Sequence, residues 1–484
     1  MNTRRNFLKL AGYGTLGASL FPRLGKSAAP IFQGLEKNTA PRPNIIFILA
    51  DDVGFEALGC YGGVKYKGLG PVKTPNLDAM GKNGMLFKYA FACPVCSPAR
   101  SEALTGKYNF RVGFPRIMGK PGVVDQLDFK AHPTVALRLK EAGYVTAVVG
   151  KWHVGPPFTK ANEVEEIPKS AEADTDYPHP HACGFDRQCL FSGGHLETYG
   201  EPKPGKYTPE LLQKWALNFL EGRKGKAEPF FLYYPSPIPH GPHFPTPLNP
   251  QGPVGGKRGD LKNFPFLMEY LDQQVGEVLA KLKELGMSEN TLVMFAGDNG
   301  TDKVVTQMRD GREVNGGKGS PLDTGAWVPL LANWPGTIKA GSVYGGLVDF
   351  TDILPTCLEL AGVAPHAGVD GVSFAPQLSG QSGSLRQAVF VLGGDRWYVR
   401  DAQWKLNSNG QLFNVSDSPY VEALMKPEND TAESKAARVR LQAVLDKVHP
   451  EIRVPSKPGF PRCAPQSHVL DVHLHRINKG SDRC

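Results

Sequence analysis

The stretch Asn44-Ile-Ile-Phe-Ile-Leu-Ala50, which runs directly into Asp51-Asp52-Val-Gly54, decides the fold of this chain. A short, continuous apolar run is typical of a strand that is covered on both faces, as in a parallel sheet. Two adjacent carboxylates after such a strand are costly unless a positive group lies beside them. Ligands of open α/β sheets bind at the carboxyl ends of strands. The stretch therefore predicts an α/β fold with a cation at this strand end, and a solvated acidic loop is the alternative.

Three further apolar runs have the same form, and each also leads into polar residues. They cover residues 144–149, 229–234 and 291–295. Amphipathic helices are expected over 134–142 and 266–285, because apolar residues recur at helical spacing and a glycine follows each. This alternation predicts a large mixed, mostly parallel sheet sandwiched by helices, with the strand ends meeting at one edge. The polar residues expected at that edge are Lys151, His153, His240, Asp298 and Asn299.

A second stretch, Cys93-Pro-Val-Cys96-Ser-Pro-Ala-Arg100, places a cysteine at the start of a short predicted helix. Pro98 is expected at the first helical position, where its missing N–H costs nothing. Arg100 lies one turn beyond Cys96 and can fold back toward the sulfur. The N-terminus of a helix favours anions. Two interpretations come from these residues alone: a buried structural cysteine, or a redox pair of Cys93 with Cys96.

A third interpretation comes from resemblance. Cys96-Ser-Pro-Ala-Arg100, followed by Leu104-Thr-Gly-Lys107, resembles the C-x-P-S/A-R…L-T-G-R/K motif of type I sulfatases, the formylglycine-dependent, cysteine-type family of the alkaline phosphatase superfamily. The likeness extends from about residue 43 to residue 415, with further motifs in the family's order. They are Asp51-Asp52-Val-Gly54, Thr74-Pro-Asn-Leu-Asp78, Gly150-Lys-Trp-His-Val-Gly155, Gly184-Phe-Asp186, Pro239-His240-Gly-Pro242, Asp298-Asn299-Gly300 and Gly316-Gly-Lys318.

The resemblance implies a metal-assisted site built on an oxidised cysteine. Cys96 would be converted to formylglycine, and one hydroxyl of the hydrated aldehyde would be the nucleophile. One cation would be bound, with Ca²⁺ favoured over Mg²⁺ or Mn²⁺ because the protein's ligands are all hard oxygens. The metal ligands implied are Asp51, Asp52, Asp298, Asn299 and residue Cys96 in its modified form.

The resemblance also implies roles for five basic residues. Arg100 and Lys151 would hold the nucleophile in its charged form. His240 and Lys318 would bind the ester and stabilise or protonate the leaving oxygen. His153 would take the proton from the second hydroxyl, so that sulfate is expelled and the aldehyde forms again.

One segment near Lys318 departs from the family pattern. The chain has Asp323-Thr-Gly-Ala-Trp-Val-Pro329 where the family has E-G-G-x-R-V-P. Lys318 stays aligned, but the departure leaves its surroundings, and with them the leaving-group specificity, open.

The function implied is sulfuric ester hydrolysis, with inorganic sulfate released from a sulfated polysaccharide, oligosaccharide or aryl sulfate. A formylglycine-generating enzyme would then be a partner. Three alternatives stay open: a phosphoester or phosphonate hydrolase of the same superfamily, a non-catalytic binder of sulfated glycans, and a thiol oxidoreductase that uses Cys93 and Cys96.

The first 29 residues are typical of a twin-arginine export signal. Arg4 and Arg5 precede a modest apolar run, and Ser27-Ala-Ala29 resembles a cleavage site. We therefore expect the twin-arginine machinery as a partner, and a periplasmic or secreted protein without stable membrane insertion. The segment carries five basic residues and no acid, so its removal lowers the net charge from +8 to about +3. This small charge gives no indication of a nucleic-acid partner.

Beyond the leader, we predict a catalytic domain over 42–365, a smaller α+β subdomain over 366–455 and a tail over 456–484. The subdomain is expected to hold a short antiparallel sheet, with a hairpin turn at Asn409-Gly410, and a helix over 432–448. An acidic stretch between 155 and 184 is either a substrate-facing insertion or a solvated loop. Eight cysteines are too few for a disulfide scaffold, and the candidate pairs are Cys183 with Cys189 and Cys463 with Cys484.

Overall fold

A computed structural model describes residues 42–156, 174–191, 202–203, 205–256 and 259–448. The predicted leader at 1–29, most of the acidic stretch between 155 and 184, and the tail from 456 with its two cysteines lie outside the described residues.

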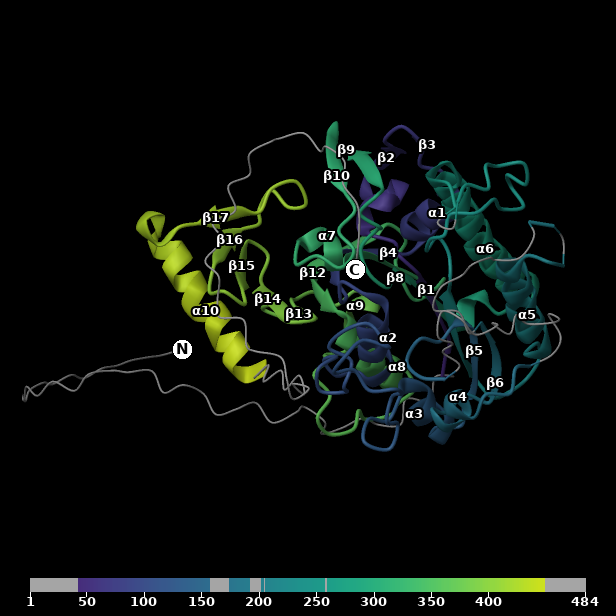
Figure 1. The fold of residues 1–484 in the computed structure, drawn as a ribbon. Coiled ribbons are helices and arrows are strands. Elements are labelled where there is room, and N and C mark those ends of the chain that lie inside the picture. The colour runs from purple at the N-terminus through teal and green to yellow at the C-terminus, as the bar shows by residue number, and fades with distance from the viewer. Residues whose placement is uncertain (1–41, 157–173, 192–201, 204, 257–258, 449–484) are drawn as a thin grey trace, which may run out of the picture. The chain divides into compact units, whose positions relative to one another are not determined.

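The largest sheet among the described residues has eight strands (Figure 1). β11 is antiparallel to both of its neighbours, whereas every other neighbouring pair in this sheet is parallel. The predicted mixed, mostly parallel sheet is therefore confirmed. Its order is β12 (Ser342–Asp349), β4 (Met85–Phe91), β11 (Trp327–Asn333), β8 (Thr291–Gly297), β1 (Asn44–Ala50), β7 (Phe230–Ser236), β5 (Val145–Lys151) and β6 (Arg187–Phe191).

The first face of the sheet packs on long amphipathic helices. Ile46 and Ile48 of β1 point to this face, because successive side chains of a strand alternate between the two sides. Leu267 and Leu271, one turn apart, come from the facing helix, which Gly286 follows in a left-handed conformation with φ of 69°. The helices on this face are α1 (Pro75–Asn83), α5 (Thr208–Gly222) and α6 (Phe264–Glu284).

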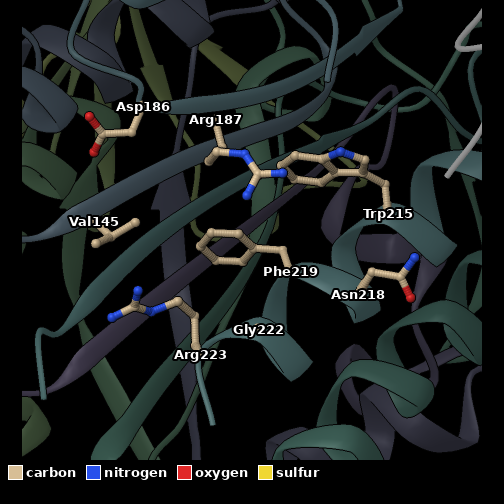
Figure 2. A pocket seen from close by; sticks show the side chains of 8 residues that line it. All are labelled: Val145, Asp186, Arg187, Trp215, Asn218, Phe219, Gly222 and Arg223. Carbon is tan, nitrogen blue, oxygen red and sulfur yellow. The ribbon is translucent and has the colours of Figure 1, made fainter. Parts of the chain in front are cut away.

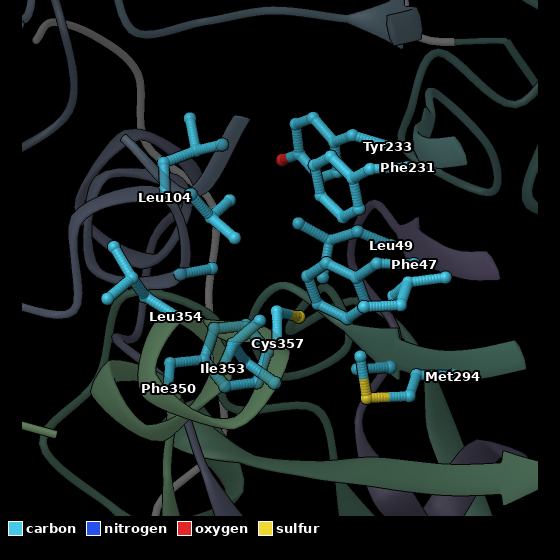
Figure 3. Close-up of a cluster of buried hydrophobic side chains, with 14 of the residues drawn as sticks. Phe47, Leu49, Leu104, Phe231, Tyr233, Met294, Phe350, Ile353, Leu354 and Cys357 are labelled. Carbon is cyan, nitrogen blue, oxygen red and sulfur yellow. The ribbon is translucent and has the colours of Figure 1, made fainter. Parts of the chain in front are cut away.

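The second face buries the other half of the same strand. Phe47 and Leu49 pack toward Ile353 and Leu354 of α8, as Figure 3 shows. Thr134 caps the N-terminus of α3, where its hydroxyl accepts a hydrogen bond from the Leu137 N–H. The helices on this face are α2 (Cys96–Thr105), α3 (Val135–Glu141), α8 (Ile353–Leu360) and α9 (Ala375–Leu378). The predicted sandwich of helices around the sheet is confirmed.

Truncation of a side chain in the first of these layers is expected to destabilise the whole domain. Leu271 is 1% exposed, so Leu271→Ala removes buried methyl groups and leaves a cavity. We expect the free energy of unfolding to fall by about 2–5 kcal/mol. Urea denaturation measures it, with Lys283→Ala on an exposed position of the same helix as the control. A change below that of the control would contradict this account of the core.

A separate antiparallel sheet follows near the C-terminus, as predicted (Figure 1). Helix α10 (Ala432–Val448) packs on it through a small apolar core that includes Leu406 and Leu441. A turn at residues 408–411 contains the predicted Asn409-Gly410 pair, and Gly410 has φ of 72°. The strands are β13 (Val389–Gly393), β14 (Arg396–Arg400), β15 (Trp404–Asn407), β16 (Leu412–Asn414) and β17 (Ala423–Met425).

The remaining elements are short. A four-stranded sheet contains β10 (Arg312–Asn315), β9 (Thr306–Arg309), β2 (Gly63–Tyr66) and β3 (Gly70–Pro71), and the short helices are α4 (Pro178–Ala182) and α7 (Asp323–Ala326). Among the described residues, no helix has the length and apolar character that crossing a bilayer requires.

Candidate active site

The tips of β1 and β8 bring the predicted acidic residues together. The last residues of the two strands, Ala50 and Gly297, are register partners. The Asp52 N–H donates to Asp298 Oδ1 at 3.1 Å, and Asn299 Nδ2 donates to Asp52 Oδ1 at 2.8 Å. Acids far apart in the sequence therefore meet, as expected for neighbouring parallel strands.

The backbone around these tips is locally constrained. Asp52 and His153 have φ of 66° and 58°, a left-handed conformation that costs free energy for residues other than glycine. Gly297 permits a close approach, because a Cβ at this position would lie 1.8 Å from the Val53 carbonyl oxygen. Such strain gathers at functional sites, and here it marks the strand ends that carry the predicted site residues.

Cys96 enters the same site from the start of α2. The helix begins at Cys96, so Pro98 occupies the third helical position, and the expectation that it stands first is wrong. The proline is still tolerated, because the first four N–H groups of a helix have no partner within it. The Cys96 thiol donates to Asp51 Oδ1 at 3.2 Å, and Lys151 Nζ lies 3.9 Å from the sulfur.

Arg100 is fully buried and connects three parts of the site. Its Nε and Nη2 donate to Asp298 Oδ2 at 3.1 and 2.8 Å. Its Nη1 donates to the Lys151 carbonyl at 2.8 Å, and Nη2 lies 3.4 Å from Asp51 Oδ2. These contacts place the guanidinium beside Asp51, the same carboxylate that accepts from the Cys96 thiol.

Two lysines and a histidine complete the set. Lys151 Nζ lies 2.6 Å from Asp51 Oδ2, and Lys318 Nζ lies 2.7 Å from the Asp52 carboxylate. His240 Nε2 lies 3.8 Å from Asp52 Oδ2. The structure therefore places these three basic residues beside the paired carboxylates.

Burial and charge set the protonation states of the acids. Burial alone would raise the pKa of Asp51, but Lys151, His240 and Arg100 together lower it well below its ordinary value. Burial and the Asp51 charge raise the pKa of Asp298 to about 7, against the opposing effect of Arg100. Asp51 is thus ionised at neutral pH. Any additional positive charge near Asp298 would stabilise the ionised form of that carboxyl.

The thiol of Cys96 is not prepared for chemistry as a thiolate. Burial, and then the charges of Asp298 and Asp51, raise its pKa well above the ordinary value, although Lys151 opposes them. Catalytic and redox cysteines need a lowered pKa, because the thiolate is the reactive form. Cys93 is also buried and accepts a hydrogen bond from Asn109 Nδ2 at 3.1 Å, and burial raises its pKa too. Both observations weigh against the redox interpretation.

No disulfide joins the cysteines that the structure describes. Cys93, Cys96, Cys183 and Cys189 are all free thiols, so the candidate pair Cys183 with Cys189 is not formed.

The donor set fits a divalent cation. One ligand atom from each of Asp51, Asp52, Cys96 and His240 lies within 4.8 Å of the others. Asn299 Oδ1 is buried and accepts no hydrogen bond from any described residue. An unsatisfied buried oxygen beside two carboxylates is the environment that a hard cation satisfies. His240, which we predicted to bind the ester, is part of this cluster. Asp298 is not part of it and accepts a hydrogen bond from Arg100 instead.

His153 lies among the positive groups of the site. It is 4% exposed, and burial, Lys151 and Arg100 lower its pKa well below the ordinary value. Its imidazole is therefore neutral at pH 7 and able to take a proton. His243, a neighbour of His240, packs its ring edge-on against Phe264 instead, at 5.5 Å between ring centroids.

Two supporting residues of the site had no motif to reveal them. Thr301 Oγ1 accepts from the Gly54 N–H at 3.0 Å and donates to Glu56 Oε1 at 2.8 Å. Burial raises the pKa of Glu56 to about 7, against this hydrogen bond. The pair fixes the turn that follows Asp52. A buried acid soon after Asp51-Asp52 and a threonine just beyond Asp298-Asn299 are the only sequence signals, and both are weak alone.

A cavity of about 570 Å³ lies away from this chemistry. Figure 2 shows Phe219 between Arg187 and Arg223 in its lining. Val145 and Arg187 are the first residues of β5 and β6, so the cavity is at the strand ends opposite Lys151. Its charges are already paired, Arg187 with Asp174 and Arg223 with Glu228, and it contains none of the predicted site residues.

Comparison with known proteins identifies the family of this chain. The family model described as Sulfatase matches residues 43–363. The N-acetylgalactosamine-6-sulfatase of Canis lupus familiaris is 32% identical over 422 residues, which cover 77% of this chain and 73% of that protein. The ulvan-active sulfatase of Formosa agariphila is 31% identical over 381 residues, which cover 74% of this chain and 62% of that protein.

The fold agrees as well. The crystal structure of Ps i-CgsB in complex with k-i-k-neocarrahexaose is 25% identical, with a TM-score of 0.66, and the alignment covers 86% of this chain and 94% of that one. The family match spans most of the described chain and both strand tips of the site. This chain therefore belongs to the sulfatase family, and it is a sulfuric ester hydrolase.

Proposed function

We propose that this protein releases inorganic sulfate from a sulfated carbohydrate, with residue 96 acting as formylglycine. The observation that carries the proposal is the convergence of Asp51, Asp52, Cys96 and His240 within 4.8 Å, with Lys151 2.6 Å from Asp51. Five motifs from separate parts of the chain supply this cluster and its positive neighbours. The pKa of the Cys96 thiol is raised well above its ordinary value, so the unmodified side chain is a poor nucleophile. This supports its conversion to another nucleophile at the same position.

A calcium ion would be held by Asp51, Asp52, Asn299 and residue 96, with Asp298 beside them. The orphaned Asn299 Oδ1 and the hard oxygens of the carboxylates support this choice over softer metals. When bound, the ion supplies positive charge to the sulfate oxygens and lowers the pKa of a neighbouring hydroxyl.

Arg100 and Lys151 orient and charge the nucleophile. Both lie against Asp51, and Lys151 Nζ is also 3.9 Å from the atom that occupies the nucleophile's position. The hydrated aldehyde at residue 96 would supply a hydroxyl that attacks sulfur in line, and the S–O bond to the alcohol breaks. Positive charge fixed around the attacking oxygen stabilises it in the ionised form.

Lys318 and His240 act at the leaving oxygen. Both lie beside Asp52, and although burial opposes it, the Asp52 charge raises the pKa of Lys318, so that this side chain stays charged. A charged ammonium beside the departing alkoxide stabilises it or gives it a proton. Burial lowers the pKa of His240 to about 4, so its neutral ring binds rather than protonates.

His153 completes the cycle as the base. Its neutral ring would take the proton from the second hydroxyl of residue 96. The bond between the carbon of residue 96 and the sulfate oxygen then breaks, sulfate leaves, and the aldehyde forms again. An ordinary serine has no second oxygen for this elimination.

A sulfated polysaccharide or its fragments is the substrate class we propose. Support comes from similar proteins, since one is described as ulvan-active and another was solved in complex with k-i-k-neocarrahexaose. We also propose a formylglycine-generating enzyme as the partner that modifies Cys96, export through the twin-arginine route to the periplasm or medium, and domain boundaries at 42–365 and 366–455.

Paired ester substrates test the reaction type. We expect 4-nitrophenyl sulfate to be hydrolysed with a kcat/KM at least about 100-fold above that of 4-nitrophenyl phosphate, because the chain belongs to the sulfatase family. Release of nitrophenol measures both rates in one preparation. A preference for the phosphate would favour the phosphoester hydrolase, and binding of sulfated glycan without turnover would favour the non-catalytic binder.

A further inference from the structure

The loop that carries Lys318 is held from two sides. It covers residues 316–322, between β10 and α7. On the side of the large sheet, the Lys318 N–H donates to the Thr301 carbonyl at 3.0 Å, and the Gly319 N–H donates to the Pro94 carbonyl at 2.7 Å. These bonds join the first half of the loop to Thr301, which directly follows Asp298-Asn299-Gly300, and to the segment just before Cys96.

The second half of the loop takes its partners from the C-terminal antiparallel sheet. Lys405 Nζ, from β15, donates to the Pro321 carbonyl at 2.8 Å and lies 3.4 Å from Asp323 Oδ1. It also lies 2.7 Å from Glu422 Oε2, and Glu422 Oε1 accepts from the Asp323 N–H at 2.7 Å. Lys405 thus joins the loop backbone to two carboxylates.

These contacts form a buried network of balanced charge. Asp323, Arg400 and Lys405 are 0%, 1% and 2% exposed. Arg400 pairs with Asp323, and the Ser418 hydroxyl donates to the same carboxylate at 2.7 Å. Two acids and two bases compensate one another, which a buried set of charges requires. Asp323 is the first residue of the segment that departs from the E-G-G-x-R-V-P pattern, and it stands where that pattern has its glutamate. The network of charges accounts for an acid at this position.

We propose that Lys405 is a positioning residue, which holds the end of the 316–322 loop so that the Lys318 ammonium stays at Asp52. The C-terminal sheet thereby takes part in catalysis without touching the substrate. The inference rests on the proposed function, in which Lys318 acts at the leaving oxygen. Its effect is therefore greatest where the leaving group most needs a cation.

The dependence of kcat/KM on the leaving group tests the role. Substituted phenyl sulfates, from 4-nitrophenyl to 4-methoxyphenyl, provide leaving phenols of rising pKa. We expect Lys405→Met to lower kcat/KM by about 10-fold or more for the poorest leaving group and by much less for the best, because a small displacement of a catalytic group has a large effect on rate. Lys426→Met, at an exposed position just after β17, is the control and should match the wild type.

A double-mutant cycle separates positioning from general destabilisation. Lys318→Ala combined with Lys405→Met should lose no more than Lys318→Ala alone, since both changes remove the same contribution. Equal losses across all leaving groups, or additive losses in the cycle, would overturn the positioning role.

A charge-balanced variant covers the case in which Lys405→Met fails to fold. Lys405→Met with Glu422→Gln leaves no unpaired acid but still lacks the donor to the Pro321 carbonyl, and it should show the same steeper dependence. Circular dichroism confirms that it is folded. If the wild type hydrolyses none of the phenyl sulfates and releases no sulfate from a sulfated glycan, the proposed function fails. If the wild type is active and this variant keeps its leaving-group dependence, the positioning role alone fails.

Discussion

Cys96→Ala is expected to abolish sulfate ester hydrolysis, with a loss of about 10⁴-fold or more in kcat, while the protein stays folded. The side chain is buried at the first turn of α2, and alanine fits there without a clash. The loss is large because no other residue of the cluster can supply an oxygen that is later regenerated by elimination. Nitrophenol release measures the rate, and near-ultraviolet circular dichroism reports the fold.

Cys93→Ala is the matched control for this variant. Cys93 is as deeply buried as Cys96 and lies three residues earlier, but its sulfur contacts Asn109 rather than the acidic cluster. We expect it to keep at least about half of the wild-type activity. Full activity in Cys96→Ala would end the proposed mechanism, and loss of activity in Cys93→Ala alone would revive the redox pair.

Removal of divalent cations is expected to have the second largest effect. Incubation with a chelator should lower kcat/KM by about 100-fold or more, and Ca²⁺ should restore it, because the positive charge beside Asp51, Asp52 and Asn299 is then replaced. Activity measured against free Ca²⁺ concentration gives the half-saturating value. Activity that is unchanged after exhaustive chelation would contradict a metal-assisted site.

Asn299→Ala localises the cation to this cluster. The variant removes the buried Oδ1 that accepts no hydrogen bond among the described residues, and we expect the half-saturating Ca²⁺ concentration to rise by about 10-fold or more. Asn83→Ala, at the exposed end of α1, should leave that concentration unchanged. Equal Ca²⁺ dependence in the two variants would place the ion elsewhere.

Much of the fold and of the site could be predicted because the information is local. The continuous apolar run of β1 supplies side chains to both faces of the sheet, and the strand ends at Ala50, directly before Asp51. The runs that end before Asp298 and at Lys151 behave in the same way. Parallel strands place such ends at one edge, so the meeting of Asp51, Lys151 and Asp298 follows from strand boundaries.

The rest depends on contacts that sequence patterns do not encode. Helix α2 begins at Cys96, whereas the sequence predicted a start at Pro98. The packing of the preceding loop sets a helix end as much as a proline does. The supports of the site, Thr301 with Glu56 and Lys405 with Pro321, join segments through single side chains. A lone threonine or lysine carries no periodicity, so only the folded chain reveals these partners.

Mass analysis of the tryptic peptide over residues 89–100, taken from active, alkylated protein, tests the central claim most directly. The peptide contains both Cys93 and residue 96. We expect one alkylated cysteine, at 93, and an aldehyde or its hydrate at 96 that reacts with a hydrazide, in proportion to the active fraction of the enzyme. Two alkylated cysteines in a fully active preparation would contradict the account.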